Sequence, residues 1–188
     1  AVSSAVAEAA MATGVARRPI ADLDAYRRDL SARLDPTASF LQDVYERISP
    51  AKKRIVFAEG EEEVAIRAAV AFRNGGYGHP ILLGREHRIR EAMERMGLDG
   101  IDDLEFTNAK ISDHNTGYIS FLYKKLQRRG VLERDCQRMV NLDRNVFAAC
   151  MVANSHADGL VTGLTRSFRS TFEHVTRVIN SSGSKEFT

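Results

Sequence analysis

Short apolar segments that end in glycine turns and lead into helical patterns constrain the fold of this chain more than any other feature. Three of them cover residues 54–58, 79–84 and 159–162. Gly60, Gly84 and Gly163 lie at their ends, and residues 104–107 predict a further strand. Strands that alternate with helices are typical of a parallel sheet with helices on both faces. We therefore predict a three-layer, doubly wound, mostly parallel α/β fold that binds ligands at the carboxyl ends of its strands.

The remaining segments of this region predict helices. One helix runs to Arg73, a second spans residues 86–96, and most of residues 113–155 is helical with breaks near Gly130 and Asp143. The glutamates at 61–63 are expected in the first turn of a helix, where negative charge is favoured, although a place in a cleft is the alternative. The basic residues at 85, 87, 88 and 90 alternate with acidic ones and indicate a solvated face.

The last strand runs directly into the turn Thr162-Gly163-Leu164-Thr165, and a helix is predicted over residues 167–178. Helix N-termini offer unpaired N–H groups and a partial positive charge, which suit phosphate or carboxylate groups. The predicted ligand-binding residues are Thr162, Gly163, Thr165, Arg166, Ser167 and Arg169. The alternative is a simple strand-to-helix turn with Thr165 as the N-cap.

The chemistry of this predicted site is left open by the sequence. Arg166 and Arg169 would meet phosphate groups in the first interpretation and would be solvated in the second. His174 follows Ser170 by one helical turn, as a general base could, but a surface histidine is the favoured interpretation. No nucleophile motif and no metal-ligand spacing is present, so we predict neither a catalytic residue nor a metal site.

Composition excludes several classes of protein. The net charge of +2 and the absence of interleaved aromatic residues argue against nucleic acid as a partner. No apolar run is long enough to span a bilayer, and residues 1–16 are not a convincing signal peptide. Cys136 and Cys150 lie in apolar, helical surroundings, which indicates buried thiols and a cytoplasmic location.

The two ends of the chain differ from the predicted α/β region, which covers residues 51–180. Residues 1–33 contain helical patterns, and residues 34–50 form a helical linker with an apolar face too small to bury much core. Residues 181–188 read SSGSKEFT and have no pattern of helix or strand. Because Gly-Ser and Glu-Phe are also encoded by common cloning sites, we expect a non-native or disordered tail there.

Four stretches in order resemble the first part of the phosphate acetyltransferase family. They read KKRIVFAEGEEEVAIRAA, GYGHPILLG, YKKLQRRGV and NSHADGLVTGLTRSF. The N-terminal stretch AVAEAAMATGVARRPIADLDAYRRDL resembles the end of the catalytic part of a bacterial malic enzyme. In tandem, the two are similar to hybrid NADP-dependent malic enzymes with a phosphate acetyltransferase-like C-terminal region, and residues 1–33 would then be the end of the malic enzyme part.

The resemblance implies a domain of two α/β subdomains, with CoA and acetyl phosphate bound in the cleft between them. This chain would hold most of the first subdomain. The malate, metal and NADP sites of the parent enzyme would lie upstream, so NADP and a divalent metal, Mg or Mn, are implied for the parent and no cofactor for this chain. Uncovered apolar surface would favour self-association, so we expect a homo-oligomer.

Two departures from the family pattern bear on chemistry. Leu126 and Glu173 stand where phosphate acetyltransferases carry arginines, which match phosphate oxygens in bidentate fashion. The resemblance therefore implies a non-catalytic region that senses acetyl-CoA and regulates an attached malic enzyme. An active phosphate acetyltransferase, which makes acetyl-CoA and phosphate from acetyl phosphate and CoA, is the alternative, and a purely structural role is a third.

Overall fold

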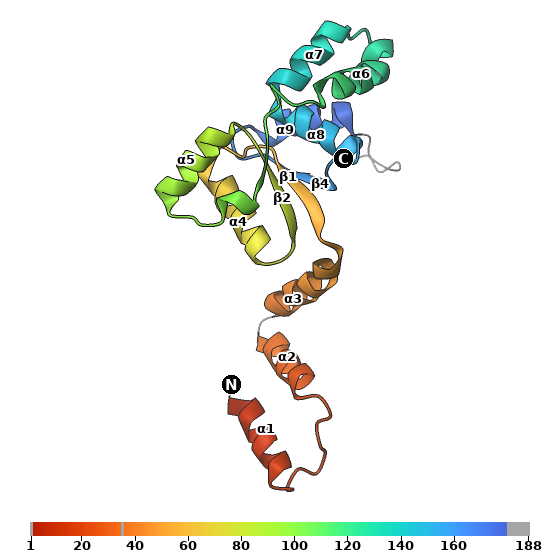
Figure 1. The fold of residues 1–188 in the computed structure, drawn as a ribbon. Coiled ribbons are helices and arrows are strands. Elements are labelled where there is room, and N and C mark those ends of the chain that lie inside the picture. The colour runs from red at the N-terminus through yellow and green to blue at the C-terminus, as the bar shows by residue number, and fades with distance from the viewer. Residues whose placement is uncertain (1, 35, 180–188) are drawn as a thin grey trace. The chain divides into compact units, whose positions relative to one another are not determined.

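The computed structural model describes residues 2–34 and 36–179 (Figure 1). The predicted tail at residues 181–188 lies outside the described residues. The chain divides into two compact units, Ala1–Pro50 and Ala51–Thr188.

The described part of the first unit contains helices joined by turns and no strand. It contains α1 (Val2–Ala12), α2 (Leu23–Leu34) and α3 (Pro36–Ile48), followed by a 3-10 turn at Ser49–Ala51. No residue with a described side chain is buried in this unit, and Phe40 on α3 is 66% exposed. Helices lie in both stretches for which the sequence predicts them, residues 1–33 and 34–50, and they bury little core of their own.

The second unit is built on a four-stranded parallel sheet. Its strands are β1 (Lys53–Phe57), β2 (Gly78–Leu83), β3 (Glu105–Thr107) and β4 (Gly159–Val161). The strand order is β3-β2-β1-β4, so the chain moves outward from β1 to β3 and then returns to the other side of β1. Val56 of β1 lies opposite Ile81 on one side and Leu160 on the other. The predicted parallel α/β fold is confirmed.

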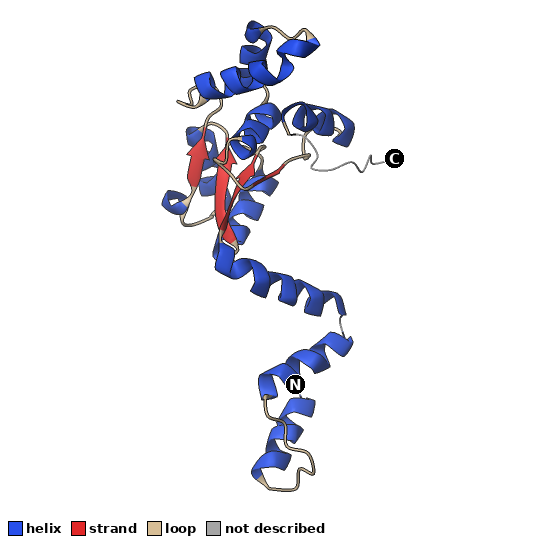
Figure 2. Cartoon of the chain, turned by 90° about the vertical axis from the view of Figure 1, so that its right-hand side faces the viewer, coloured by secondary structure: helices blue, strands red, loops and turns tan. Residues whose placement is uncertain are grey.

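Helices cover both faces of this sheet (Figure 2). They are α4 (Glu63–Asn74), α5 (Glu86–Met96), α6 (Asn115–Leu126), α7 (Glu133–Leu142), α8 (Arg144–Ala153) and α9 (Phe168–Val178), with 3-10 turns at Ile101–Asp103 and Gln127–Arg129. Alternate strand residues face opposite sides. Val56 and Ile81 therefore join the core under α6 and α8, while Phe57 and Leu82 join the core under α4 and α5.

The cysteines, the basic cluster and the helix lengths can each be compared with the sequence predictions. Cys136 and Cys150 are buried and free of any disulfide, as the sequence predicts. The charges at residues 85–90 are in ion pairs: Arg90 contacts Glu86 and Asp102, and Arg85 and Arg88 contact Glu61. None of the described helices is long and apolar enough to cross a membrane.

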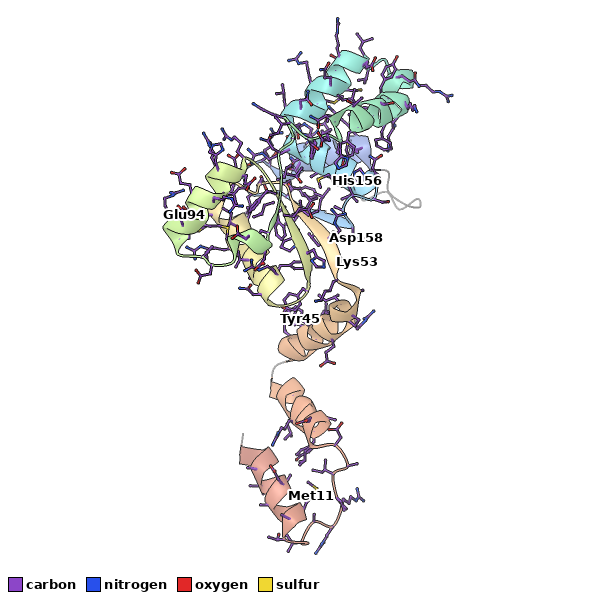
Figure 3. All side chains as sticks on the ribbon, viewed as in Figure 1. Met11, Tyr45, Lys53, Glu94, His156 and Asp158 are labelled. Carbon is purple, nitrogen blue, oxygen red and sulfur yellow. The ribbon has the colours of Figure 1, made fainter. Side chains whose placement is uncertain are left out.

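The amino edge of the sheet is held by Asp158, the residue before β4. Its carboxylate accepts a hydrogen bond from the N–H of Arg54 at 2.8 Å and lies 3.3 Å from Nζ of Lys53 (Figure 3). These contacts join the start of β4 to the start of β1 and lower the pKa of Asp158. They fix the register of β4 against β1. They therefore also fix where the turn at residues 162–165 leaves the carboxyl edge of the sheet.

Candidate functional site

The turn after β4 lies where ligands bind most often in doubly wound sheets. The strand order reverses between β1 and β4, and the crevice at the carboxyl ends of two such strands is the usual binding position. Residues 162–165 follow β4 there, beside residues 58–60 at the end of β1. Gly163 has a φ of 112°, a conformation that side chains other than glycine's rarely adopt.

An internal carboxylate already occupies this turn. One oxygen of Glu59 accepts from the backbone N–H groups of Gly163 at 2.9 Å and Leu164 at 2.8 Å. The other accepts from the N–H and the hydroxyl of Thr165, each at 2.7 Å. The donors that the sequence predicts for a ligand anion are therefore bound to an anion of the chain itself.

Glu59 is 2% exposed, yet it is held in its charged form. Burial by itself would raise the pKa of its carboxyl, but the four hydrogen bonds from residues 163–165 outweigh burial and lower the pKa below the ordinary value. The adjacent Gly60 makes this possible, because a Cβ there would lie 2.8 Å from the backbone nitrogen of Leu83. The chain can thus pass tightly from β1 towards the neighbouring turn.

Two predictions about nearby residues were wrong. Thr165 does not cap α9: the N-cap is Ser167, whose hydroxyl accepts from the N–H of Ser170 at 3.4 Å. Of the glutamates at 61–63, only Glu63 lies in the first turn of α4. Glu61 instead binds Arg85 through both oxygens, because the chain between β1 and α4 makes a turn before the helix begins.

The predicted residues Thr162 and Arg166 contact the start of α8, although Arg166 remains exposed to solvent. The hydroxyl of Thr162 donates to Oδ1 of Asn145 at 2.6 Å. Arg166 forms an ion pair of 2.6 Å with Oδ2 of Asp143, and Nδ1 of His174 lies 2.9 Å from the same oxygen. The other oxygen of Asp143 caps the first turn of α8. These contacts fasten α8 to the turn and to α9.

Asp143 also fixes the proton on His174. Arginine can only donate, and a carboxylate can only accept, so both Arg166 and Nδ1 of His174 donate to Asp143. Burial acts to raise the pKa of Asp143, but hydrogen bonds from Arg166 and the N–H of Val146 lower it overall. Asp143 is therefore a partly buried carboxylate that is shared by two basic side chains.

Arg169 is the predicted residue that stays free of such contacts. It is exposed in the first turn of α9 and makes no hydrogen bond or ion pair within the described part of the chain. Glu59, Asp143 and Asn145 were not predicted as site residues. Their partners lie 17 to 106 residues away in sequence, and no local pattern reports such distances. Among the described residues, no group of three His, Cys, Asp or Glu side chains could hold a metal ion.

Comparison with known proteins identifies the family. The pattern of the phosphate acetyl/butaryl transferase family matches residues 39–187. This chain belongs to that family. A phosphotransacetylase structure from Streptococcus pyogenes superposes with a TM-score of 0.70 and 25% identity, over 76% of this chain and 43% of the other. The predicted resemblance is confirmed.

Relatives of this phosphate acetyl/butaryl transferase family member include longer enzymes. An NADP-dependent malic enzyme from Rhizobium meliloti (strain 1021) is 53% identical over 96% of this chain and 24% of its own length. A phosphate acetyltransferase from Staphylococcus aureus (strain MRSA252) is 28% identical over 76% of this chain and 42% of its own. This chain spans about a quarter of the length of the malic enzymes that it matches.

The two positions where the family was expected to carry arginine differ in their surroundings. Leu126 is 3% exposed and packs in the core with residues of α7 and α8, so a leucine here stabilises the fold. Glu173 is exposed on α9 and pairs with Arg177 at 2.5 Å. Only Glu173 therefore changes the charge of the exposed surface. A buried leucine at position 126 is explained by core packing and is not evidence that a phosphate-binding arginine has been lost.

Proposed function

We propose that this chain is part of a cytoplasmic NADP-dependent malic enzyme, which decarboxylates malate oxidatively to pyruvate. The observation that carries the proposal is the 53% identity to the Rhizobium meliloti enzyme over 96% of this chain. The NADP and the divalent metal, Mg or Mn, would be bound by the remaining three quarters of such an enzyme. The free, buried thiols of Cys136 and Cys150 fit a reducing compartment.

Within that enzyme, the region described here would sense acetyl-CoA and would not catalyse transfer of the acetyl group. Transfer builds negative charge on phosphate oxygens, which need free donors. The N–H groups of residues 163–165 are committed to Glu59, and Glu173 adds a negative charge on α9. Both features disfavour catalysis of acyl phosphate transfer at this edge.

Arg169 is the residue of the predicted site best suited to test effector binding. Thr165 and Arg166 contact Glu59 and Asp143, so changing either would disturb the fold as well as any ligand. Arg169 is exposed and unpaired among the described residues, and its guanidinium is available to a phosphate of CoA. Arg67, exposed on α4, is a matched control for the loss of one positive charge.

The test is NADP reduction from malate by the longer enzyme while acetyl-CoA is titrated. We expect a saturable fall in rate, with a midpoint that rises by about tenfold in Arg169→Gln, the effect of losing one charge-assisted hydrogen bond, and stays unchanged in Arg67→Gln. A flat response would refute acetyl-CoA sensing and leave a structural role in assembly.

The alternative of an active phosphate acetyltransferase is favoured by the relatives that bear this name. It predicts that the same enzyme forms acetyl-CoA from acetyl phosphate and CoA. Formation of the thioester at a rate proportional to enzyme concentration would support this alternative over the sensing role.

We also propose that the enzyme is a homo-oligomer and that the apolar surface of β4 and α9 takes part in assembly. Phe168 is 80% exposed and stacks on Phe172, and Val161 and Leu164 are about half exposed nearby in sequence. Apolar surface of this kind favours association. A monomeric mass by light scattering at micromolar concentration would contradict the proposal.

A further inference from the structure

Three aromatic rings meet where the start of α6 lies against the chain that leaves α8. They belong to His114, the N-cap of α6, to Tyr118 in the first turn of that helix, and to His156, which follows α8 (Figure 3). The ring centroids of His114 and His156 are 4.2 Å apart, and they lie 5.7 Å and 5.6 Å from that of Tyr118. None of the six ligand-binding residues predicted from the sequence belongs to this ring cluster.

The hydroxyl of Tyr118 determines which nitrogen of His156 carries the proton. Tyr118 is 1% exposed, and within the described part of the chain its hydroxyl has one hydrogen-bond partner, Nδ1 of His156 at 2.5 Å. Burial raises the pKa of Tyr118 to about 12, so the hydroxyl keeps its hydrogen and needs an acceptor. Nδ1 accepts only when it is unprotonated, so His156 is neutral here and carries its proton on Nε2.

The surroundings of His156 oppose a second proton on its ring. Burial is the largest cause that lowers the pKa of His156, and interactions with His114 and with Arg54 of β1 lower it further. From α8, the thiol of Cys150 acts on Tyr118, and burial keeps that thiol neutral by raising its pKa to about 12. The closed cluster therefore favours a neutral histidine.

Two carboxylates at the amino edge of the sheet are already engaged by basic groups. Glu105 of β3 pairs with Arg54 at 3.2 Å. Asp158, two residues after His156, accepts from the N–H of Arg54 and pairs with Lys53. A positive charge on the ring of His156 would therefore find no acidic partner within the described part of the chain.

We propose that the ring cluster is an acid-sensitive switch, which holds the start of α6 against the turn before β4 and releases it when Nδ1 of His156 gains a proton. That proton points a donor at the buried hydroxyl of Tyr118, whose own hydrogen then has no acceptor. Ser155 has a φ of 61°, which serine rarely adopts, so the turn is strained while it is closed and opens readily once the bond is lost.

The pH dependence of the switch has a definite sign. The pKa of His156 is lowered in the folded chain from the ordinary value of 6.5, so the closed cluster is fully stable above pH 6.5 and loses stability as the pH falls towards the folded pKa. In that window opening takes up one proton, so the ratio of open to closed molecules rises by up to about tenfold per pH unit.

Nuclear magnetic resonance of the full chain between pH 7.5 and 5.5 tests the switch, in a range where the stabilisation by Glu59 is still complete. At pH 7.5 the ring ¹⁵N shifts of His156 should show an unprotonated Nδ1 and a protonated Nε2. The amides of Tyr118 and His156 bond to the carbonyls of His114 and Met151, so their exchange reports opening of the cluster. Their protection, corrected for intrinsic exchange, should fall by about threefold to tenfold between pH 7.5 and 5.5.

Three variants separate the switch from general effects of acid. His156→Gln cannot gain this proton and should show the same protection at both pH values, whereas His87→Gln, which changes an exposed histidine of α5, should behave like the native chain. His114→Gln removes a neighbour that opposes protonation, so the titration of His156 should move to higher pH, and this readout decides the question even where His156→Gln folds poorly.

Three results would each overturn the proposal. They are a proton on Nδ1 of His156 at pH 7.5, protection of the native chain that does not change between pH 7.5 and 5.5, and an equal fall in protection in a folded His156→Gln variant.

Discussion

Replacing Glu59 by glutamine tests whether the buried carboxylate holds the turn after β4. Glutamine keeps the size of the side chain but has one acceptor oxygen, so its NH₂ must face either residues 163 and 164 or Thr165. Hydrogen bonds to a charged group stabilise by about 1.5–3 kcal/mol each and neutral ones by about 0.5–1.5 kcal/mol. Because the backbone of the turn is exposed and water can replace part of the loss, we take the low end for all four bonds. Four bonds of about 1.5 kcal/mol each are replaced by two of about 0.5 kcal/mol each, so the free energy of unfolding should fall by about 5 kcal/mol at pH 7.

The effect should depend on pH with a definite sign. The folded pKa of Glu59 is lowered from the ordinary value of 4.5, so its stabilisation is present in full above pH 4.5 and is lost as the pH falls towards the folded pKa. The difference in the free energy of unfolding between the native chain and Glu59→Gln should therefore decrease by about 1.4 kcal/mol per pH unit in that window.

Urea unfolding followed by circular dichroism, at pH 7 and at steps below 4.5, measures this gap. Glu62→Gln is the matched control, because the Glu62 carboxylate makes no hydrogen bond within the described part of the chain. Amide exchange of residues 163–165 should also accelerate in Glu59→Gln. A gap below about 0.5 kcal/mol at pH 7, or one that does not change with pH, would refute the argument that these four bonds hold the turn.

Three other predictions concern the contacts of Asp143, the burial of Cys150 and the exposure of Phe168. Asp143→Ala removes the N-cap of α8 and the carboxylate shared by two basic side chains, and should lower the free energy of unfolding by about 3 kcal/mol in urea titrations. Ser167→Ala, which loses one long cap bond, should cost about 1 kcal/mol or less, and equal effects of the two changes would contradict the reasoning. Burial raises the pKa of the Cys150 thiol to about 12, so labelling by a disulfide reagent at pH 8 should be at least about a hundredfold slower in the folded chain than in urea, and fast labelling would show that the thiol is accessible. Phe168→Ser should leave the free energy of unfolding within about 0.5 kcal/mol and reduce the associated fraction in light scattering, whereas an unchanged mass would exclude this face from assembly.

The strands and helices could be predicted because their signals are local. The helix at Glu86–Met96 begins and ends where the sequence places it, and no end of the four strands differs from its predicted position by more than one residue. Apolar periodicity and glycine turns act over a few residues, and the parallel order follows from the alternation itself. The position of the turn after β4 at the carboxyl edge was predictable for the same reason.

The contents of that edge could not be predicted, since they depend on pairs distant in sequence. Glu59 and Thr165 are 106 residues apart, and nothing in either local pattern distinguishes a carboxylate that fills a turn from one that begins a helix. The same limit applies to Leu126, which a residue-by-residue comparison placed at a ligand position and the structure places in the core. Local sequence gives the donors of a turn, and only the tertiary fold gives their acceptor.

The loop after β1 explains why free donors lie farther out on this edge. Glu59 and Glu61 are two residues apart, and their side chains reach in opposite directions, Glu59 to the turn after β4 and Glu61 to Arg85 after β2. One short acidic loop therefore neutralises the donors of both neighbouring turns and joins the ends of three strands. Farther out on the same unit, Lys110, Arg144 and Arg169 have no acidic partner within the described part of the chain. The N–H groups of residues 163–165 are bound to Glu59, so a ligand anion could use them only by displacing a carboxylate of the chain itself.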